Sequence, residues 1–308
     1  MQRWIVGVMC WVCAVTAGCK NAGPAGATSS AVATASSPSV GSASAAPTGN
    51  PSTRAPGEKG SVGVGFLLLK SPSSRVNEAE LAAASKTLGL GAFAKGTEGS
   101  DEVMAYRLGD RDVMVTIIPM PHPDAPKMPA GPFSPRSDQI ASSKAHAIVA
   151  VPKLVGTPVQ QDATMARIVA AVAKSMDATA AMLGRGVMFY LADIFVAAAE
   201  SADPGQPPLE VTVDITVAPE GDRHVSLLTH GLSRYGREEL YVKSNRAAIE
   251  DAMDFTWAMS RWVVADPDKR FPTGDTVGRS ASERLVVQRV PSPADDGSTV
   301  VLFDMTRP

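Results

Sequence analysis

The spacing of apolar residues along the chain predicts several β-strands. The run 62–69 is apolar almost throughout, which favours a buried strand. Apolar and polar residues alternate most regularly over 209–217, so we expect a strand there with one face in solvent. The runs 103–108 and 113–118 flank a Gly-Asp-Arg-Asp segment, and this arrangement predicts a hairpin. Further strands are expected at 145–151, 225–229, 239–242, 285–290 and 299–303.

Apolar residues recur at helical spacing in several other segments. Asn77 is followed three residues later by Glu80, which is the pattern of a helix N-terminus, and Gly89 ends that helix. Other helices are expected at 165–176, 189–199 and 249–262, the last capped by Asn245. This order of elements predicts an α+β fold, with a mixed, largely antiparallel sheet and helices packed on it. Each half places a helix between strands, so two weakly similar halves are an open alternative.

The N-terminal segment has the features of a lipoprotein signal peptide. Arg3 is followed by the apolar segment 4–15, which is too short to be a permanent membrane anchor. The sequence VTAGC at 15–19 resembles the bacterial lipobox, although Thr16 replaces the usual Leu. We therefore expect cleavage before Cys19 and attachment of diacylglycerol to its thiol. An ordinary secretory signal, cleaved after the small residues, is the alternative.

A segment of small and polar residues separates this signal peptide from the predicted domain. Residues 20–60 are mostly Ala, Ser, Gly, Pro and Thr, and such a composition cannot bury enough apolar surface to fold. A random coil of this length spans about 35 Å, which would carry a domain clear of lipid headgroups. The expected protein is exported to the cell envelope and held on a membrane through Cys19, and Lys20 favours the outer membrane. Its expected parts are a lipoprotein signal peptide at 1–18, a disordered tether at 19–60 and a single α+β domain at 61–308.

Charge and cysteine content narrow the choice of partners. The 29 Lys and Arg residues are balanced by 31 Asp and Glu residues, so no positive field favours nucleic acid. All 3 cysteines lie at or before Cys19, which leaves the predicted domain without a disulfide or a thiolate metal site. The 4 histidines are scattered and form no metal-binding motif. We therefore expect no metal, no cofactor and no nucleic-acid partner.

The predicted domain contains no complete catalytic motif. The segment 231–236 resembles a nucleophile elbow, but its second glycine lies one place too far along. The segment 274–280 superficially resembles a phosphate loop, but it lacks the lysine and the full spacing. His146 lies beside apolar residues, so we expect it to be a buried, hydrogen-bonded structural residue.

These two glycine-rich segments form the candidate binding surface. Glycine lets the backbone turn with positive φ or approach a partner closely, and polar side chains flank both segments. We therefore expect 231–236 and 274–278 to lie close together at one end of the sheet. The alternative is that both are only tight connections. The side chains of the neighbours Glu238 and Glu239 should point to opposite faces of a strand, so we expect a solvated charge pair and no carboxylate dyad. The candidate residues are His230, Gly231, Gly236, Arg237, Glu239, Gly274, Asp275, Thr276, Gly278 and Arg279.

Several short motifs follow one another along the predicted domain. They are PMPHP at 119–123, SKAHAIV at 143–149, THGL at 229–232, GDTVG at 274–278 and SP at 292–293. Together they resemble the bacterial domain of unknown function 4261 family across Val64 to Phe303. The chain has Ser143 where the family's first histidine is expected, and it adds a lipobox and a tether. The resemblance implies a shared fold but transfers no activity, cofactor or catalytic residue.

More than one function fits this organisation. We expect a surface-tethered module that binds a protein or another envelope ligand, because a long spacer precedes a domain without catalytic motifs. The first alternative is an enzyme of unknown class that uses His230, Glu239, Asp275 or Arg279. The second alternative is an immunity-like lipoprotein that occludes a secreted effector through an exposed acidic or apolar patch.

Overall fold

A computed structural model describes residues 61–96, 103–280 and 283–306. These residues belong to one compact unit. None of the helices in these ranges is long and apolar enough to span a membrane. The predicted signal peptide, the lipidation site at Cys19 and the tether lie outside the described residues.

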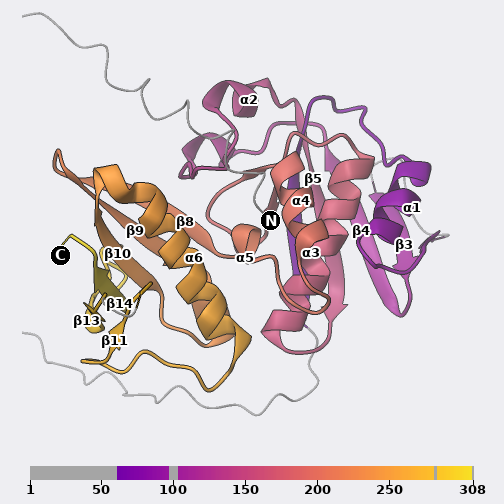
Figure 1. Cartoon of the computed structure of the whole chain (residues 1–308). Coiled ribbons are helices and arrows are strands. Elements are labelled where there is room, and N and C mark those ends of the chain that lie inside the picture. The colour runs from indigo at the N-terminus through magenta and orange to yellow at the C-terminus, as the bar shows by residue number, and fades with distance from the viewer. Residues whose placement is uncertain (1–60, 97–102, 281–282, 307–308) are drawn as a thin grey trace, which may run out of the picture. The chain divides into compact units, whose positions relative to one another are not determined.

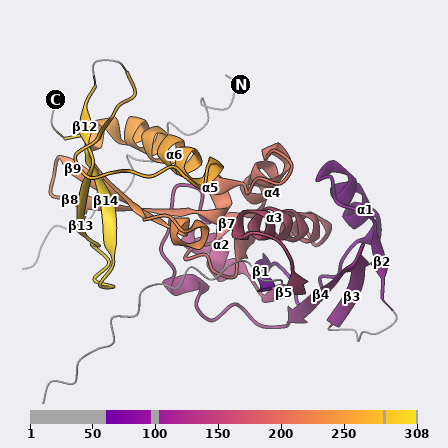
Figure 2. The same ribbon diagram turned by 90° about the horizontal axis from the view of Figure 1, so that it is seen from below.

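A seven-stranded antiparallel sheet forms the first half of the described chain (Figure 1). Its strands are β1 Ser61–Leu69, β2 Phe93–Lys95, β3 Val103–Leu108, β4 Arg111–Ile118, β5 Ala145–Leu154, β6 Ala180–Leu183 and β7 Tyr190–Leu191. Their order in the sheet is β2-β3-β4-β5-β1-β6-β7. The helical segments of this half are α1 Glu78–Thr87, η2 Ala125–Lys127, α2 Ser137–Ser142, α3 Pro158–Ser175 and α4 Ala192–Ser201. Helices α1, α3 and α4 pack on one face of the sheet and bury its main apolar core (Figure 2).

Side-chain caps fix the starts of two of these helices. The Asn77 side chain accepts hydrogen bonds from the backbone N–H groups of Ala79 and Glu80, so the predicted N-cap of α1 is confirmed. Thr157 and Gln160 form a capping box at the start of α3. These bonds satisfy donors that the first turn of a helix leaves unpaired.

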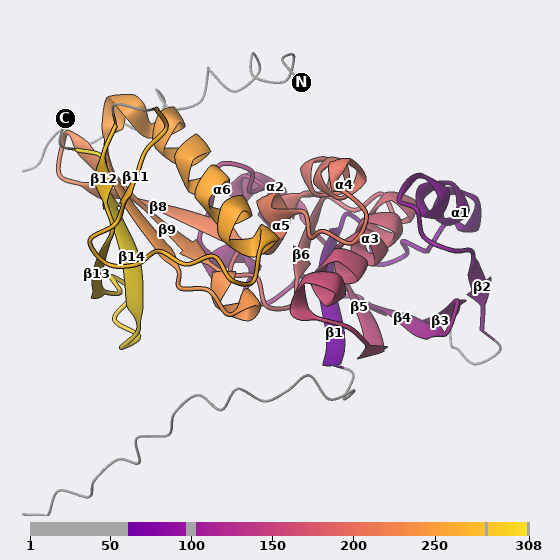
Figure 3. The ribbon, with the colours of Figure 1, turned by 60° about the horizontal axis from the view of Figure 1, so that its bottom comes forward.

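A five-stranded sheet forms the second half (Figure 3). Its elements are α5 Leu209–Thr212, β8 Asp214–Glu220, β9 His224–His230, η3 Leu232–Tyr235, β10 Leu240–Asn245, η4 Arg246–Ala248, α6 Ile249–Ala265, β13 Gln288–Pro291 and β14 Thr299–Asp304. The strand order is β13-β14-β10-β9-β8, in which β10 and β14 are parallel. A separate pair consists of β11 Thr276–Val277 and β12 Leu285–Val286. Helix α6 covers one face, where Phe303 contacts the rings of Phe255 and Phe271, each with a centroid distance of 5.2 Å.

The α+β prediction is confirmed, and the pairing is largely antiparallel with one parallel pair. The strands described here form two main sheets, whereas the sequence predicts one. The hairpin formed by β3 and β4 is confirmed, with a shorter turn than predicted because Leu108 and Arg111 are already paired. His146 is buried, and its Nδ1 lies 2.8 Å from the carbonyl oxygen of Met120, so its structural role is also confirmed.

The predicted strand over 209–217 is wrong in its first part, where α5 replaces it. The Thr212 hydroxyl donates to the carbonyl oxygen of Pro208, and proline is well tolerated at the start of a helical turn. Leu209 and Val211 are buried in this turn, so alternation alone does not distinguish it from a strand. Helix α4 begins at Ala192, later than predicted, because the preceding residues pair with β6.

Candidate functional site

A pocket of about 370 Å³ opens on the face of β8, β9 and β10 that is turned away from α6. Thr216, Leu228 and Tyr241 lie in register across the three strands. Ala218 and Ser226 are paired in the next row, and their small side chains leave the floor hollow there. The floor consists of Thr216, Ala218, Ser226, Leu228, His230 and Tyr241.

The walls of this pocket come from segments that are distant in the sequence. Pro129 lies after η2, and Val187 lies between β6 and β7. Pro293 and Ala294 come from the turn between β13 and β14. Because the first half supplies two wall residues and the second half supplies the floor, the shape of the pocket depends on how the halves are joined.

A carboxylate, a phenol and an ammonium group lie together beside the floor. The Tyr241 hydroxyl donates to Glu220, and Lys243 Nζ lies 3.2 Å from the same carboxylate. Burial raises the pKa of Glu220, but hydrogen bonds from Tyr241 and Lys243 outweigh it, so the pKa lies below its usual value. Burial, together with the bond to Glu220, raises the pKa of Tyr241. Glu220 and Lys243 therefore form an ion pair, and Tyr241 is a protonated phenol bonded to the same carboxylate.

His230 lies in the floor and bonds to another floor residue. Its Nε2 is 3.0 Å from the Thr216 hydroxyl oxygen. Asp214 is the cross-strand partner of His230, so the three side chains follow one another on the same face of β8 and β9. A catalytic triad would need an Asp214 oxygen to hold the imidazole. The hydrogen bonds of Asp214 go elsewhere, which speaks against that chemistry.

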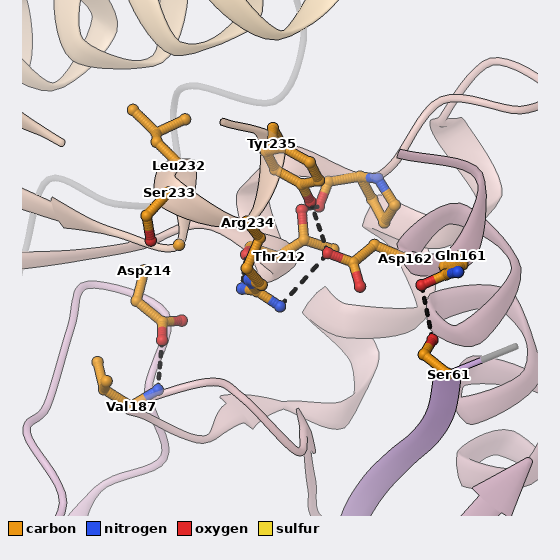
Figure 4. A network of polar contacts seen from close by, with 12 residues as sticks. Ser61, Gln161, Asp162, Val187, Thr212, Asp214, Leu232, Ser233, Arg234 and Tyr235 are labelled. Carbon is orange, nitrogen blue, oxygen red and sulfur yellow. Dashed lines mark hydrogen bonds and ion pairs between the residues drawn. The ribbon is translucent and has the colours of Figure 1, made fainter. Parts of the chain in front are cut away.

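Asp214 of β8 instead ties the second sheet to the pocket wall at Val187 (Figure 4). One carboxylate oxygen accepts the backbone N–H of Val187, and the other accepts the Tyr190 hydroxyl at 2.6 Å. Asp214 is 2 % exposed, and burial raises its pKa in spite of these two bonds. Because Val187 is a wall residue, Asp214 fixes the pocket at the junction of the two halves.

A second polar cluster joins the halves beside Asp214 (Figure 4). Asp162 of α3 accepts a hydrogen bond from the Tyr235 hydroxyl at 2.9 Å and lies 3.4 Å from Arg234 Nη1. Arg234 also donates to the carbonyl oxygen of Thr212. Burial, followed by the nearby Asp162 charge, raises the pKa of Tyr235. This cluster holds η3 against α3 and so supports the same junction.

Of the predicted surface, the structure places His230 in the pocket and its neighbours in a turn. The Glu239 carboxylate accepts backbone N–H bonds from Gly231, Leu232 and Ser233, so it caps η3 and is not a solvated charge. Gly231 has a φ of 122°, and an added Cβ would lie 2.9 Å from the Thr212 carbonyl oxygen. Gly236 is left-handed at the other end of η3. Backbone geometry thus accounts for both glycines.

Arg237 and Arg279 bind opposite ends of α6. The Arg237 guanidinium donates to the carbonyl oxygens of Val263 and Asp266 at the C-terminal end. Arg279 lies 3.5 Å from Asp251 in the first turn. The helix has 17 residues and spans about 25 Å, so these two side chains do not share one surface.

The 274–278 turn makes mainly local contacts. The backbone N–H of Gly274 donates to Val287, and the N–H of Val287 donates to Asp275. Thr276 pairs with Val286 in the short β11–β12 ladder. A Cβ at Gly278 would lie 2.3 Å from the Glu283 carbonyl oxygen, so close backbone packing accounts for this glycine. A binding role for the turn stays a prediction.

Of the residues that line the pocket, the sequence predicts a binding role for His230 and for no other. The alternation over 209–217 indicates that Asp214 and Thr216 share a polar face, and this was the available signal. Ser226 and Tyr241 become neighbours of that face only through strand register. The wall residues carry no motif, so the sequence gives no sign of their position.

Comparisons with protein-family models, curated proteins and solved structures found no match to the chain. The resemblance to the domain of unknown function 4261 family therefore stays a prediction. Within the described ranges, no group of three or more His, Cys, Asp or Glu residues is arranged to hold a metal ion.

Proposed function

We propose that the chain is a membrane-tethered envelope lipoprotein whose folded part is a binding module, with the pocket on β8, β9 and β10 as its ligand site. The observation that carries this proposal is the pocket itself. Its volume of about 370 Å³ falls within the range of about 300–1,000 Å³ that is typical of ligand sites. A lipid on Cys19 would keep this site close to a membrane.

The side chains around the pocket support binding over catalysis. Tyr241 is held as a phenol by its bond to Glu220, so it is poorly suited to give up a proton. Among the lining residues, this leaves His230 as the side chain suited to acid–base chemistry. Acid–base catalysis commonly uses a second, oriented group, and Asp214 is already bonded to Val187 and Tyr190.

Site-specific crosslinking in intact cells tests this function without presuming a ligand. The photoreactive residue p-benzoylphenylalanine replaces Ala294, an exposed residue of the pocket wall, so the floor stays open to the ligand. The matched control carries the same group at Val155, which is 46 % exposed and lies outside the pocket. Irradiation should give a covalent adduct at position 294 and none at position 155, detected by mass spectrometry. Equal labelling at both positions, or no adduct at 294, contradicts the proposal.

A further inference from the structure

We propose that the pocket binds a small, uncharged molecule with a compact apolar body of one or two rings and one hydrogen-bonding group, and that it discriminates against charged ligands. This inference rests on the proposed function and deepens it by naming the class of ligand. It is carried by three features of the pocket, namely an apolar lining, neighbouring charges that already have partners, and one imidazole nitrogen without a partner among the described residues.

The lining of the pocket is mostly apolar. The walls contribute two prolines, a valine and an alanine, and the floor contributes Leu228 and Ala218. A cavity of about 150 Å³ with an apolar lining is large enough to hold benzene. The volume of about 370 Å³ is therefore enough for a body of one or two rings. Such a ligand gains affinity by removing apolar surface from water.

Each charged group next to the pocket already has a partner. Glu220 accepts the Tyr241 hydroxyl and forms an ion pair with Lys243. Asp214 accepts hydrogen bonds from Tyr190 and a backbone N–H, and the Arg234 charge lies nearby. A charged ligand would lose its hydration here without meeting an unpaired counter-charge, which is unfavourable. The pocket should therefore select against both anions and cations.

His230 supplies a directional contact for the ligand. Its Nε2 bonds to Thr216, whereas its Nδ1 has no hydrogen-bond partner among the described residues. An N–H or O–H group on the ligand can pair with this nitrogen, or a carbonyl can pair with it in the other tautomer. Thr216 helps to orient the ring, since it holds the opposite nitrogen.

The edge strand β8 is poorly placed to pair with a peptide, which favours a free small molecule as the ligand. A peptide that added a strand to the sheet would pair with β8, which is an edge strand. Pro219 in this strand has no N–H to offer such a peptide. Further along the same strand, Gly131 approaches the carbonyl oxygen of Ile215, with 3.6 Å between that oxygen and a Cβ built on Gly131. Little of the β8 edge is therefore open to another main chain.

Three probes that share one ring system test this inference. Indole is uncharged and carries one N–H, indole-3-acetate adds a negative charge, and tryptamine adds a positive charge. Binding to the full chain is measured at pH 7.5 from the backbone amide shifts of the floor residues. Indole should bind, and each charged probe should bind at least about tenfold more weakly, which corresponds to about 1.4 kcal/mol.

Two neighbouring substitutions serve as test and control. Ala218→Leu places extra carbon atoms in the floor and should abolish indole binding. Val217→Leu adds one carbon atom at the next residue, which is 36 % exposed and lies outside the pocket, and should leave indole binding unchanged. Both sites are exposed, so both variants should fold. Loss of binding in both variants overturns the assignment to the pocket.

The outcomes separate the ligand class from the proposed function. Equal or tighter binding of a charged probe, abolished by Ala218→Leu, overturns the ligand class but leaves the binding module intact. If indole does not bind, the ligand class is overturned. If position 294 also gives no crosslinked adduct in cells, the proposed function fails with it. A blocked Gly-Trp-Gly peptide that binds tenfold tighter than indole overturns the assignment to a free small molecule.

Discussion

Replacing Asp214 with Ala should strongly destabilise the fold, because two donors lose their acceptor inside the protein. These donors are the Val187 N–H and the Tyr190 hydroxyl, and Tyr190 is only 3 % exposed. An unsatisfied buried donor costs about 1–3 kcal/mol, so the expected loss is about 2–6 kcal/mol. For a domain of this size, even the lower value corresponds to a fall in Tm of about 4 °C.

Urea unfolding of the whole chain at pH 7 measures this loss. Asp214→Asn is the matched control, since the amide can accept from Val187 and donate to the Tyr190 oxygen, and it should cost less than about 1 kcal/mol. Adding Tyr190→Phe to the alanine variant removes the orphaned hydroxyl and should restore about 1 kcal/mol. The reasoning is refuted if the alanine variant is as stable as the asparagine variant, or if Tyr190→Phe lowers its stability further.

The difference in stability between wild type and Asp214→Asn should depend on pH. Burial raises the pKa of Asp214 in the folded state above its unfolded value of about 3.9. The folded protein therefore takes up this proton first as pH falls, and the stability contributed by Asp214 rises until pH reaches about 4. The stability of wild type relative to Asp214→Asn should thus increase between neutral pH and pH 4. A difference that is constant, or that moves in the opposite direction, would contradict the assigned environment.

Three further predictions concern the anchor, the tether and the η3 turn. Cys19→Ser should abolish acylation and membrane association, and unacylated wild-type protein in a mass spectrum would rule out the lipoprotein assignment. Deleting residues 20–60 should change the free energy of unfolding by less than about 1 kcal/mol, whereas a larger loss in urea unfolding would mean that the segment docks. Gly231→Ala should cost more than about 1 kcal/mol, because its φ is 122° and the new Cβ would crowd Thr212. Gly236→Ala is a milder control, since no atom lies within 4 Å of its added Cβ, and equal losses would contradict the steric argument.

Much of the fold could be predicted from local patterns. The Asn77 cap and the paired runs on either side of Gly109 depend on neighbouring residues, and both are confirmed. The α5 turn was missed because Leu209 and Val211 are buried in either a strand or a helical turn. The division into two sheets depends on pairings such as the parallel contact of β10 with β14, which no local pattern encodes.

The pocket could be predicted only in fragments. The place of His230 beside a glycine indicates a binding role, and the structure puts this residue in the floor. The polarity of Arg237 and Glu239 suggests the same role, but their hydrogen-bonding groups hold α6 and η3. A polar residue beside a turn can satisfy backbone groups or meet a ligand, and only tertiary contacts decide between these roles. Wall residues such as Pro129 and Val187 have no chemistry that would mark them beforehand.

The position of β14 has a consequence for the order of folding. This strand lies between β10 and β13, although α6 and three shorter strands separate it from β10 in the sequence. Its Phe303 fills the space between Phe255 and Phe271 under α6. Pairings between distant segments form slowly, and the second sheet cannot close until β14 has been synthesised. During synthesis, the second half should therefore stay open longer than the first.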